Sequence, residues 1–598
     1  MKTKVRLDSG NTLLVTVITM AIVGVFIDLA MQYTNSIGRN VQRSMLLRQA
    51  TGVADASTEM AFSAWRAICR QNQSKIYKRS DIDTEIPTPS PASFPGVTYK
   101  LLNYAVYPLD SYWNKKTAGS STPAPIAGPN HGDLSYYYLA TADVIVPTVS
   151  SKTASNLAAA AALTDKGNVI ARVRRVFQKE SLSLWRYAIF YDDDMEIHPG
   201  PTMNVTGDVH TNGSLYTGHN TLTLSGKTTY TDTWSIGFMN GDSTHPEKPT
   251  SPNWATGLPP AADQEQQPYG VHLDDYHALI DYTTTATSLD PYRFQSQASV
   301  VVTIDGSNNI RVFDKTGALI TTNGNGNGNG GRLKTSIINA LTTDQNITDK
   351  REGATTGNGT IRLTTLDVSQ ITAAANSGDL NYKGSFNGII YIVDTSADPN
   401  GVTAKRGIRL VNGGKLPNGG LTVASANPVY VQGDYNTGTV PSSTPGATPS
   451  IQPPSNSGDP TNPTIFGYDR QPAAVVSDAV TILSNSWQDS SSGTMPAASA
   501  TTVNAAIVSG NVPTGNGYYS GGVENFPRFL ENWGGKNFTY YGSMIQLYQS
   551  KQGIGRWGAA SVYGAPNRAW YFDTNFVASP PPGLLASFNY RRSRWYME

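Results

Sequence analysis

The sequence is poor in cysteine and in charge. Cys69 is its one cysteine in 598 residues, which excludes an internal disulfide framework, so burial must stabilise any part outside the cytoplasm. Only 15% of residues are charged, with 45 Lys and Arg against 44 Asp and Glu, so no basic field for nucleic acid exists. The chain is too long for one core, and its 56 glycines, with many Thr, Ser, Asn and Tyr residues, favour strands and turns. Two to four mainly β domains are therefore expected.

The one long apolar run lies close to the start of the sequence. Residues 12–27 are apolar after a short basic leader, Asp28 interrupts the run, and residues 29–31 extend it. About 20 such residues span a bilayer, and no small-x-small cleavage site follows. A retained transmembrane helix over residues 11–33 is favoured over a cleaved signal or a buried core helix. Its basic leader favours a cytoplasmic N-terminus, although Arg39, Arg43 and Arg48 lie on the other side.

The helical pattern continues beyond the apolar run, over residues 34–79. Apolar residues recur there mostly at steps of three and four, which predicts an amphipathic helix with one packing face. The predicted helix-packing residues are Ile37, Val41, Met45, Val53, Met60, Ala64 and Ile68. Such a helix must pack on a globular head or on neighbouring helices.

Gly10 followed by N-T-L-L-V-T-V-I resembles the N-terminus of type IV pilin-like proteins, and is most similar to PilX-like pilus-assembly proteins. The resemblance implies a leader of residues 1–10 that is cleaved between Gly10 and Asn11. In the wider family an acid five residues into the mature chain pairs with a neighbouring amino terminus, and Val15 stands there instead. The late segment V-E-N-F-P-R-F-L-E-N-W, residues 523–533, also resembles the PilX-like group.

The resemblance implies an accessory, or minor, pilin-like protein in type IV pilus assembly or surface adhesion. Its expected partners are pilin-type helices or pilus-assembly proteins, with residues 12–31 in the membrane. The expected location is the bacterial inner membrane, single-pass, with most of the chain periplasmic or at the cell surface.

The remaining sequence is divided by composition. Prolines mark linkers at residues 80–97 and 441–463. Strand patterns at residues 99–106, 135–149 and 168–177 predict a pilin-like α/β head over residues 98–190. Short alternating runs between Gly, Asn and Asp predict a parallel β-helix or solenoid over residues 191–440, which is preferred to a β-sandwich. A C-terminal β-rich domain is predicted over residues 464–598. The fold class is α+β, mainly β.

Two features near residue 200 suggest chemistry. Strand alternation would place Asp192, Asp194, Glu196 and His198 on one face, where they could hold calcium, although an acidic turn explains them as well and no EF-hand spacing is present. Asp208 and His210 would share another face, as an acid and a base would in a polysaccharide-cleaving β-helix. No second carboxylate can be placed opposite them, so we expect no enzyme, with a tethered glycan-binding or glycan-cleaving protein as the alternative.

The last third of the chain is rich in aromatic residues. Residues Phe526, Phe529, Leu530 and Trp533 recur at helical spacing, which predicts a short helix over residues 523–533. Glu524, Arg528 and Glu531 would form a structural charged network there. Four further aromatic residues could face a surface glycan or pack in the core: Trp557, Trp570, Tyr571 and Trp595.

Overall fold

The computed structural model divides into two units. The first contains residues 1–126, 135–180 and 590–598, and the second contains residues 127–134 and 181–589. The structure describes residues 9–71, 75–127, 134–148, 168–239, 252–254, 259–262, 276–285, 292–321, 329–438, 470–514, 521–557, 562–577, 579–583 and 586–598. Residues 1–8 of the expected leader 1–10, and the expected linker 441–463, lie outside the described residues.

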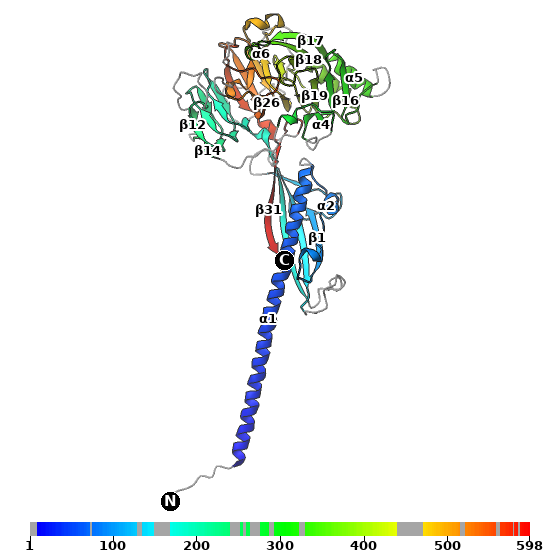
Figure 1. Cartoon of the computed structure of the whole chain (residues 1–598), viewed down its shortest axis with the longest axis vertical. Coiled ribbons are helices and arrows are strands. Elements are labelled where there is room, and N and C mark those ends of the chain that lie inside the picture. Colours follow the sequence, from blue (N-terminus) through cyan, green and yellow to red (C-terminus); the bar gives the residue numbers. More distant parts are fainter. Residues whose placement is uncertain are drawn as a thin grey trace. The chain divides into compact units, whose positions relative to one another are not determined.

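The first unit consists of one long helix, α1 (Ser9–Gln71), packed on an antiparallel sheet. The sheet order is β1 (Lys100–Pro108), β3 (Leu134–Val146), β4 (Val169–Ser183) and β31 (Ala586–Met597), with β2 (Pro125–Ala127) paired to β3. All three strands expected in the head are confirmed. The fourth strand comes from the far end of the sequence, and Figure 1 shows β31, in red, beside α1.

The sequence-based boundaries of the first unit need three corrections. The predicted amphipathic helix 34–79 ends at Gln71. The predicted linker 80–97 contains a helix, α2 (Arg79–Glu85), which buries Ile82. The C-terminal residues expected in a separate domain instead form the edge strand β31, where Tyr590 donates a hydrogen bond to the carbonyl of Cys69 at 3.3 Å.

Parallel strands dominate the second unit. Strands from β5 to β14 enter three sheets in strict rotation, and their bounds are β5 (Ile189–Tyr191), β6 (Met195–Ile197), β7 (Met203–Thr206), β8 (Val209–Thr211), β9 (Leu215–Thr217), β10 (Leu222–Leu224), β11 (Thr228–Tyr230), β12 (Trp234–Ile236), β13 (Asn253–Trp254) and β14 (Ala261–Ala262). Each strand is too short to bury itself. Their inward side chains, such as Met203, Leu215 and Leu222, are buried in one core because each strand pairs with the strand three places along the chain.

A second group of strands extends two of these sheets and forms a further sheet of its own, with the order β17-β18-β20-β22-β24-β27. Its bounds are β15 (Val300–Ile304), β16 (Ile310–Asp314), β17 (Leu341–Thr348), β18 (Thr360–Asp367), β19 (Ile389–Asp394), β20 (Arg406–Val411), β21 (Leu421–Ser425), β22 (Val429–Gln432), β23 (Ala473–Ser477), β24 (Val480–Leu483), β25 (Thr501–Asn504), β26 (Ala506–Asn511), β27 (Pro527–Phe529), β28 (Asn537–Gly542), β29 (Met544–Gln549) and β30 (Asn567–Phe572). Among these, only the β15–β16 and β17–β18 pairs are antiparallel. Four helices accompany them: α4 (Phe294–Gln297), α5 (Asn329–Asn339), α6 (Lys350–Thr356) and α7 (Val368–Asn376).

An early strand and a late strand of the second unit are neighbours. The largest sheet has the order β14-β11-β8-β5-β29-β26-β23-β21-β19-β15-β16, so β5 pairs in parallel with β29. The expected division between residues 191–440 and 464–598 is therefore wrong, because β23 lies between β21 and β26 in one sheet. No sheet in the described ranges closes on itself.

The helix predicted over residues 523–533 is also wrong. A short 3-10 helix, Val523–Asn525, is followed by β27, in which Pro527, Arg528 and Phe529 pair with β24. All of these residues are buried, so the apolar spacing reflects burial on every side. Parallel pairing overrides the helical spacing in this segment.

Candidate functional site

The exposed part of α1 is the first candidate site. One described helix is long and apolar enough to cross a membrane. Its side chains are exposed from Leu13 to Met45, and the first buried residue is Ala50. Among the described residues, nothing therefore packs on the helix before residue 46, whereas a sheet packs against it beyond that residue.

The predicted packing face is divided between these two parts. Ile37, Val41 and Met45 are exposed by 45, 54 and 61%, whereas Val53 and Ile68 are buried against the chain's own sheet. Met60 is exposed and Ala64 is half-buried. Sequence reasoning missed four other residues of α1 that are buried against the sheet: Ala50, Ala54, Ala61 and Trp65. Three of them are alanines, which give a weak apolar signal. The predicted cleavage residues Gly10 and Asn11 lie outside the part of α1 whose side chains are described.

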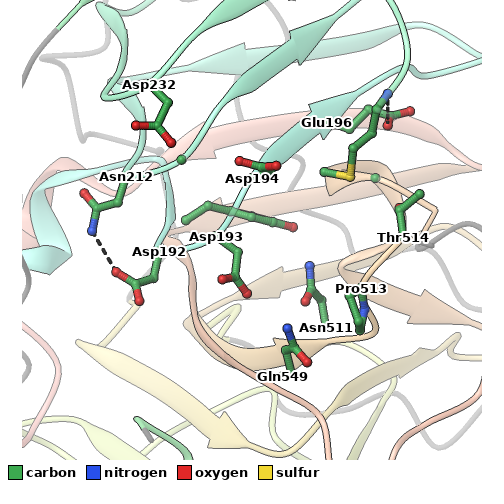
Figure 2. Close-up of a pocket in the computed structure, with 14 residues that line it drawn as sticks. Asp192, Asp193, Asp194, Glu196, Asn212, Asp232, Asn511, Pro513, Thr514 and Gln549 are labelled. Carbon is green, nitrogen blue, oxygen red and sulfur yellow. Dashed lines mark hydrogen bonds between the residues drawn. The ribbon is translucent and has the colours of Figure 1, made fainter. Parts of the chain in front are cut away.

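The second candidate is an acidic pocket in the second unit, of about 430 Å³. Figure 2 shows carboxylates from the turn between β5 and β6 on one side of it. The expected strand alternation is wrong, because Asp192 and Asp194 lie in this turn and not in a strand. Its lining combines distant segments: Asp192, Asp193, Asp194, Glu196, Asn212, Asp232, Asn511, Thr514 and Gln549.

Four carboxylates of the pocket accept hydrogen bonds from neighbouring groups. Asp192 accepts a hydrogen bond from Asn212 Nδ2 at 2.7 Å, and Asp194 accepts one from the Ser214 amide at 2.7 Å. Glu196 accepts one from the Met239 amide at 2.9 Å. Burial raises the pKa of Asp193, against the hydrogen bond from Gln546, which lowers it. These contacts fit the acidic-turn interpretation.

Three of the four predicted calcium ligands, Asp192, Asp194 and Glu196, line the pocket. His198 is absent from the pocket lining, and its Nε2 lies 2.5 Å from the carbonyl oxygen of Gly237. Within the described ranges, no three His, Cys, Asp or Glu side chains are placed to hold a metal ion. Sequence reasoning missed Asp232, Asn511 and Gln549, since only tertiary structure brings them to this turn.

The predicted acid and base are also separated. Asp208 is exposed and accepts a hydrogen bond from the Lys227 amide at 3.0 Å. His210 is fully buried, with its ring nitrogens 2.7 Å from Thr229 Oγ1 and 3.0 Å from Asn212 Oδ1. A buried histidine cannot meet a polysaccharide without rearrangement, so this pair offers no ready acid–base site.

The aromatic residues suggested as a glycan surface are dispersed. Trp570 is buried in the second unit's core, and Tyr571 stacks on Tyr541 with ring centroids 4.7 Å apart. Trp595 belongs to the first unit, where its Nε1 donates to Asp55 at 2.7 Å. Trp557 lies at a β-bridge in the second unit. The four residues therefore do not form one surface.

The charged residues of the 523–533 segment lie in the interior, as a structural network requires. Arg528 donates to Glu352 at 2.7 Å. Glu524 accepts a hydrogen bond from the His198 amide at 3.3 Å. Glu531 accepts hydrogen bonds from the Ser484 amide and hydroxyl, each at 2.6 Å.

Glu531 makes stability depend on pH. Burial raises its pKa from 4.5 to about 7, against the Ser484 hydrogen bonds, which lower it. The folded state therefore holds a proton that the unfolded state releases above pH 4.5, so stability should fall by about 3 kcal/mol as pH rises from 4.5 through 7. Glu531→Gln, which keeps the shape of the protonated acid, should remove this fall. Denaturant unfolding at several pH values measures it, and an unchanged slope in the variant would contradict the assignment.

The chain was compared with protein families, curated proteins and solved structures. No protein-family model matches the chain, and no curated protein matches it. The resemblance to PilX-like proteins therefore stays a prediction. Among solved structures, the competence-associated pilin ComZ from Thermus thermophilus matches with a TM-score of 0.27 and 11% identity, over 92% of this chain and 98% of that chain.

Proposed function

We propose that this chain is an accessory, pilin-like subunit anchored by α1 in the bacterial inner membrane, with a non-catalytic role in pilus assembly or surface adhesion. The supporting observation is the division of α1. Its apolar side chains from Leu13 to Met31 have the length of a bilayer span, and the same helix continues into a head in which Ala50, Val53 and Ala54 pack on an antiparallel sheet.

The second unit is then the part presented to the outside. We propose that its parallel sheets are the faces of a β-helix and that each coil contributes one strand to each face. The strict rotation of β5 to β14 among three sheets supports this proposal. Its early strand β5 and its late strand β29 are hydrogen-bonded neighbours. A body of this kind can be carried between β4 and β31 of a pilin-like head without breaking the head's sheet.

The identity of the first residue of the mature protein tests the proposal. Processing as in pilins leaves Asn11 as the first residue, which N-terminal sequencing of the membrane fraction measures. Gly10→Val should block the cleavage and leave the leader attached, whereas Gly24→Val, a matched change farther along α1, should leave it unaffected. A mature chain that starts after residue 33, or that sediments without membranes, would refute the proposal.

A further inference from the structure

The last strand of the first unit has an open edge. In the order β1-β3-β4-β31, β31 is outermost, and no strand in the described ranges pairs with its other edge. It is 12 residues long, about twice the usual length, and residues 591–598 are all exposed. The Glu598 amide donates to the carbonyl of Arg172 on β4 at 3.0 Å. Because backbone groups alternate sides along a strand, those of Trp595 and Met597 point to the open edge.

An edge of this kind can take another strand. Natural proteins usually shorten or cover long exposed edges, because their N–H and C=O groups are a template for pairing. At the opposite edge of this sheet, α2 lies against β1. Extended peptides that add to an open edge gain main-chain hydrogen bonds, and side chains decide which peptides fit.

Arginines lie along the open edge. The side chains of Arg591 and Arg592 are 52 and 55% exposed. Arg591 lies 3.6 Å from Glu180, and Arg592 lies 2.8 Å from Glu59. A guanidinium has five N–H donors, so both keep donors for another anion. The first unit as a whole holds 23 of the 45 Lys and Arg residues but only 12 of the 44 Asp and Glu residues, so it attracts anions.

Trp113 positions a third arginine of β31. The guanidinium of Arg594 lies 5.2 Å from the ring centroid of Trp113, and the rings of Trp113 and Tyr137 lie 4.6 Å apart. Trp113 has a φ of 67°, a strained conformation for a bulky residue and one that is common at ligand-binding sites. Arg594 has no carboxylate partner in the described part of the chain, so its N–H groups can bind an incoming anion.

A second copy of β31 does not fit this edge. β31 runs antiparallel beside α1 (Figure 1), because Tyr590 contacts Cys69 and Met597 contacts Thr51. Antiparallel pairing of two copies would therefore point their membrane anchors in opposite directions. Parallel pairing in register would set the arginines of the two strands level, and like charges opposite each other are destabilising. This exclusion rests on the proposed function, whereas the open edge and its charges do not.

We propose that the open edge of β31 binds an extended, acidic segment of another protein, which adds to the sheet as a further strand. Trp595 and Met597 contact α1, so alternation along β31 places Arg594 on the opposite face. Trp595 and Met597 are exposed by 47 and 45%. The segment that fits therefore alternates carboxylates, which pair with Arg594, and apolar side chains.

Binding of a synthetic peptide tests the proposal. The probe alternates Glu and Val over the length of β31, and its fluorescence anisotropy is measured with the full-length chain in detergent micelles. It should bind about tenfold more tightly than the same peptide with Lys in place of Glu, and hydrogen exchange of the β31 amides should slow. Because micelles replace the membrane, a chain found outside the membrane in cells refutes the proposed function and leaves this test intact.

Two variants separate strand addition from attraction by charge. Met597→Pro removes an outward N–H at an edge that tolerates proline, and should weaken binding about fivefold, whereas Met597→Ala, which keeps the N–H, should lose less. Arg594→Gln should weaken binding about tenfold. Arg39→Gln, the same change at an exposed position of α1, should leave binding unchanged.

Three results would overturn the proposal: no binding of the Glu–Val peptide, equal binding of the Lys-containing peptide, or binding that is unaffected by both Met597→Pro and Arg594→Gln. Tighter binding of a DNA oligonucleotide or of anionic lipid vesicles than of the peptide would also overturn it, because the basic edge would then serve a partner of another class.

Discussion

Replacing Trp65 with alanine is expected to unfold the first unit while leaving the second folded. Trp65 is fully buried at the centre of the helix–sheet contact. Its ring centroid lies 5.3 Å from those of Tyr138 on β3 and Phe177 on β4, and 5.8 Å from that of Tyr590 on β31. Loss of a buried tryptophan costs about 3–5 kcal/mol, a large share of the stability of a unit of this size.

Hydrogen exchange, read peptide by peptide, measures this effect in the intact chain. Amides of β3 and β4 should exchange much faster in the variant, and those of β21 and β23 should not change. Trp65→Phe is the matched control. The indole Nε1 of Trp65 has no hydrogen-bond partner among the described residues, so phenylalanine keeps the ring contacts and loses no bond. Unchanged protection in β3 after Trp65→Ala would show that α1 does not depend on this contact.

The second large effect is expected at Glu352, at the centre of a buried charge network in the second unit. Its carboxylate accepts hydrogen bonds from Lys405 at 2.9 Å, from Arg528 at 2.7 Å and from the Gly555 amide at 2.9 Å. All three charged side chains are at most 5% exposed. Glu352→Gln would leave two buried cations without their shared anion, and breaking a buried pair in this way costs about 3–5 kcal/mol.

Denaturant unfolding of the second unit measures the loss, and two variants interpret it. Arg332→Gln removes a cation that is 60% exposed beside Asp379, so it should cost less than about 1 kcal/mol. The double variant Glu352→Gln with Lys405→Met removes one of the stranded charges, and it should be less destabilised than the sum of its single changes. An additive result would show that Glu352 and Lys405 act independently.

The same network explains why the segment 523–533 misled prediction. Its Phe and Trp residues do recur at the spacing of a helix face. Phe526 and Phe529 are nevertheless buried in one core together with β24, and Arg528 points to Glu352, 176 residues earlier. Local periodicity cannot reveal a partner so distant in the chain.

The sequence by itself determined the long helix, the three strands of the head and the abundance of short strands, because these depend on local patterns of apolar residues. Tertiary structure alone decided that β31 completes the first sheet, that β5 pairs with β29, and which carboxylates meet at the pocket beside Asp192. The two strand pairings join residues hundreds of positions apart, and no local preference of either partner specifies the other.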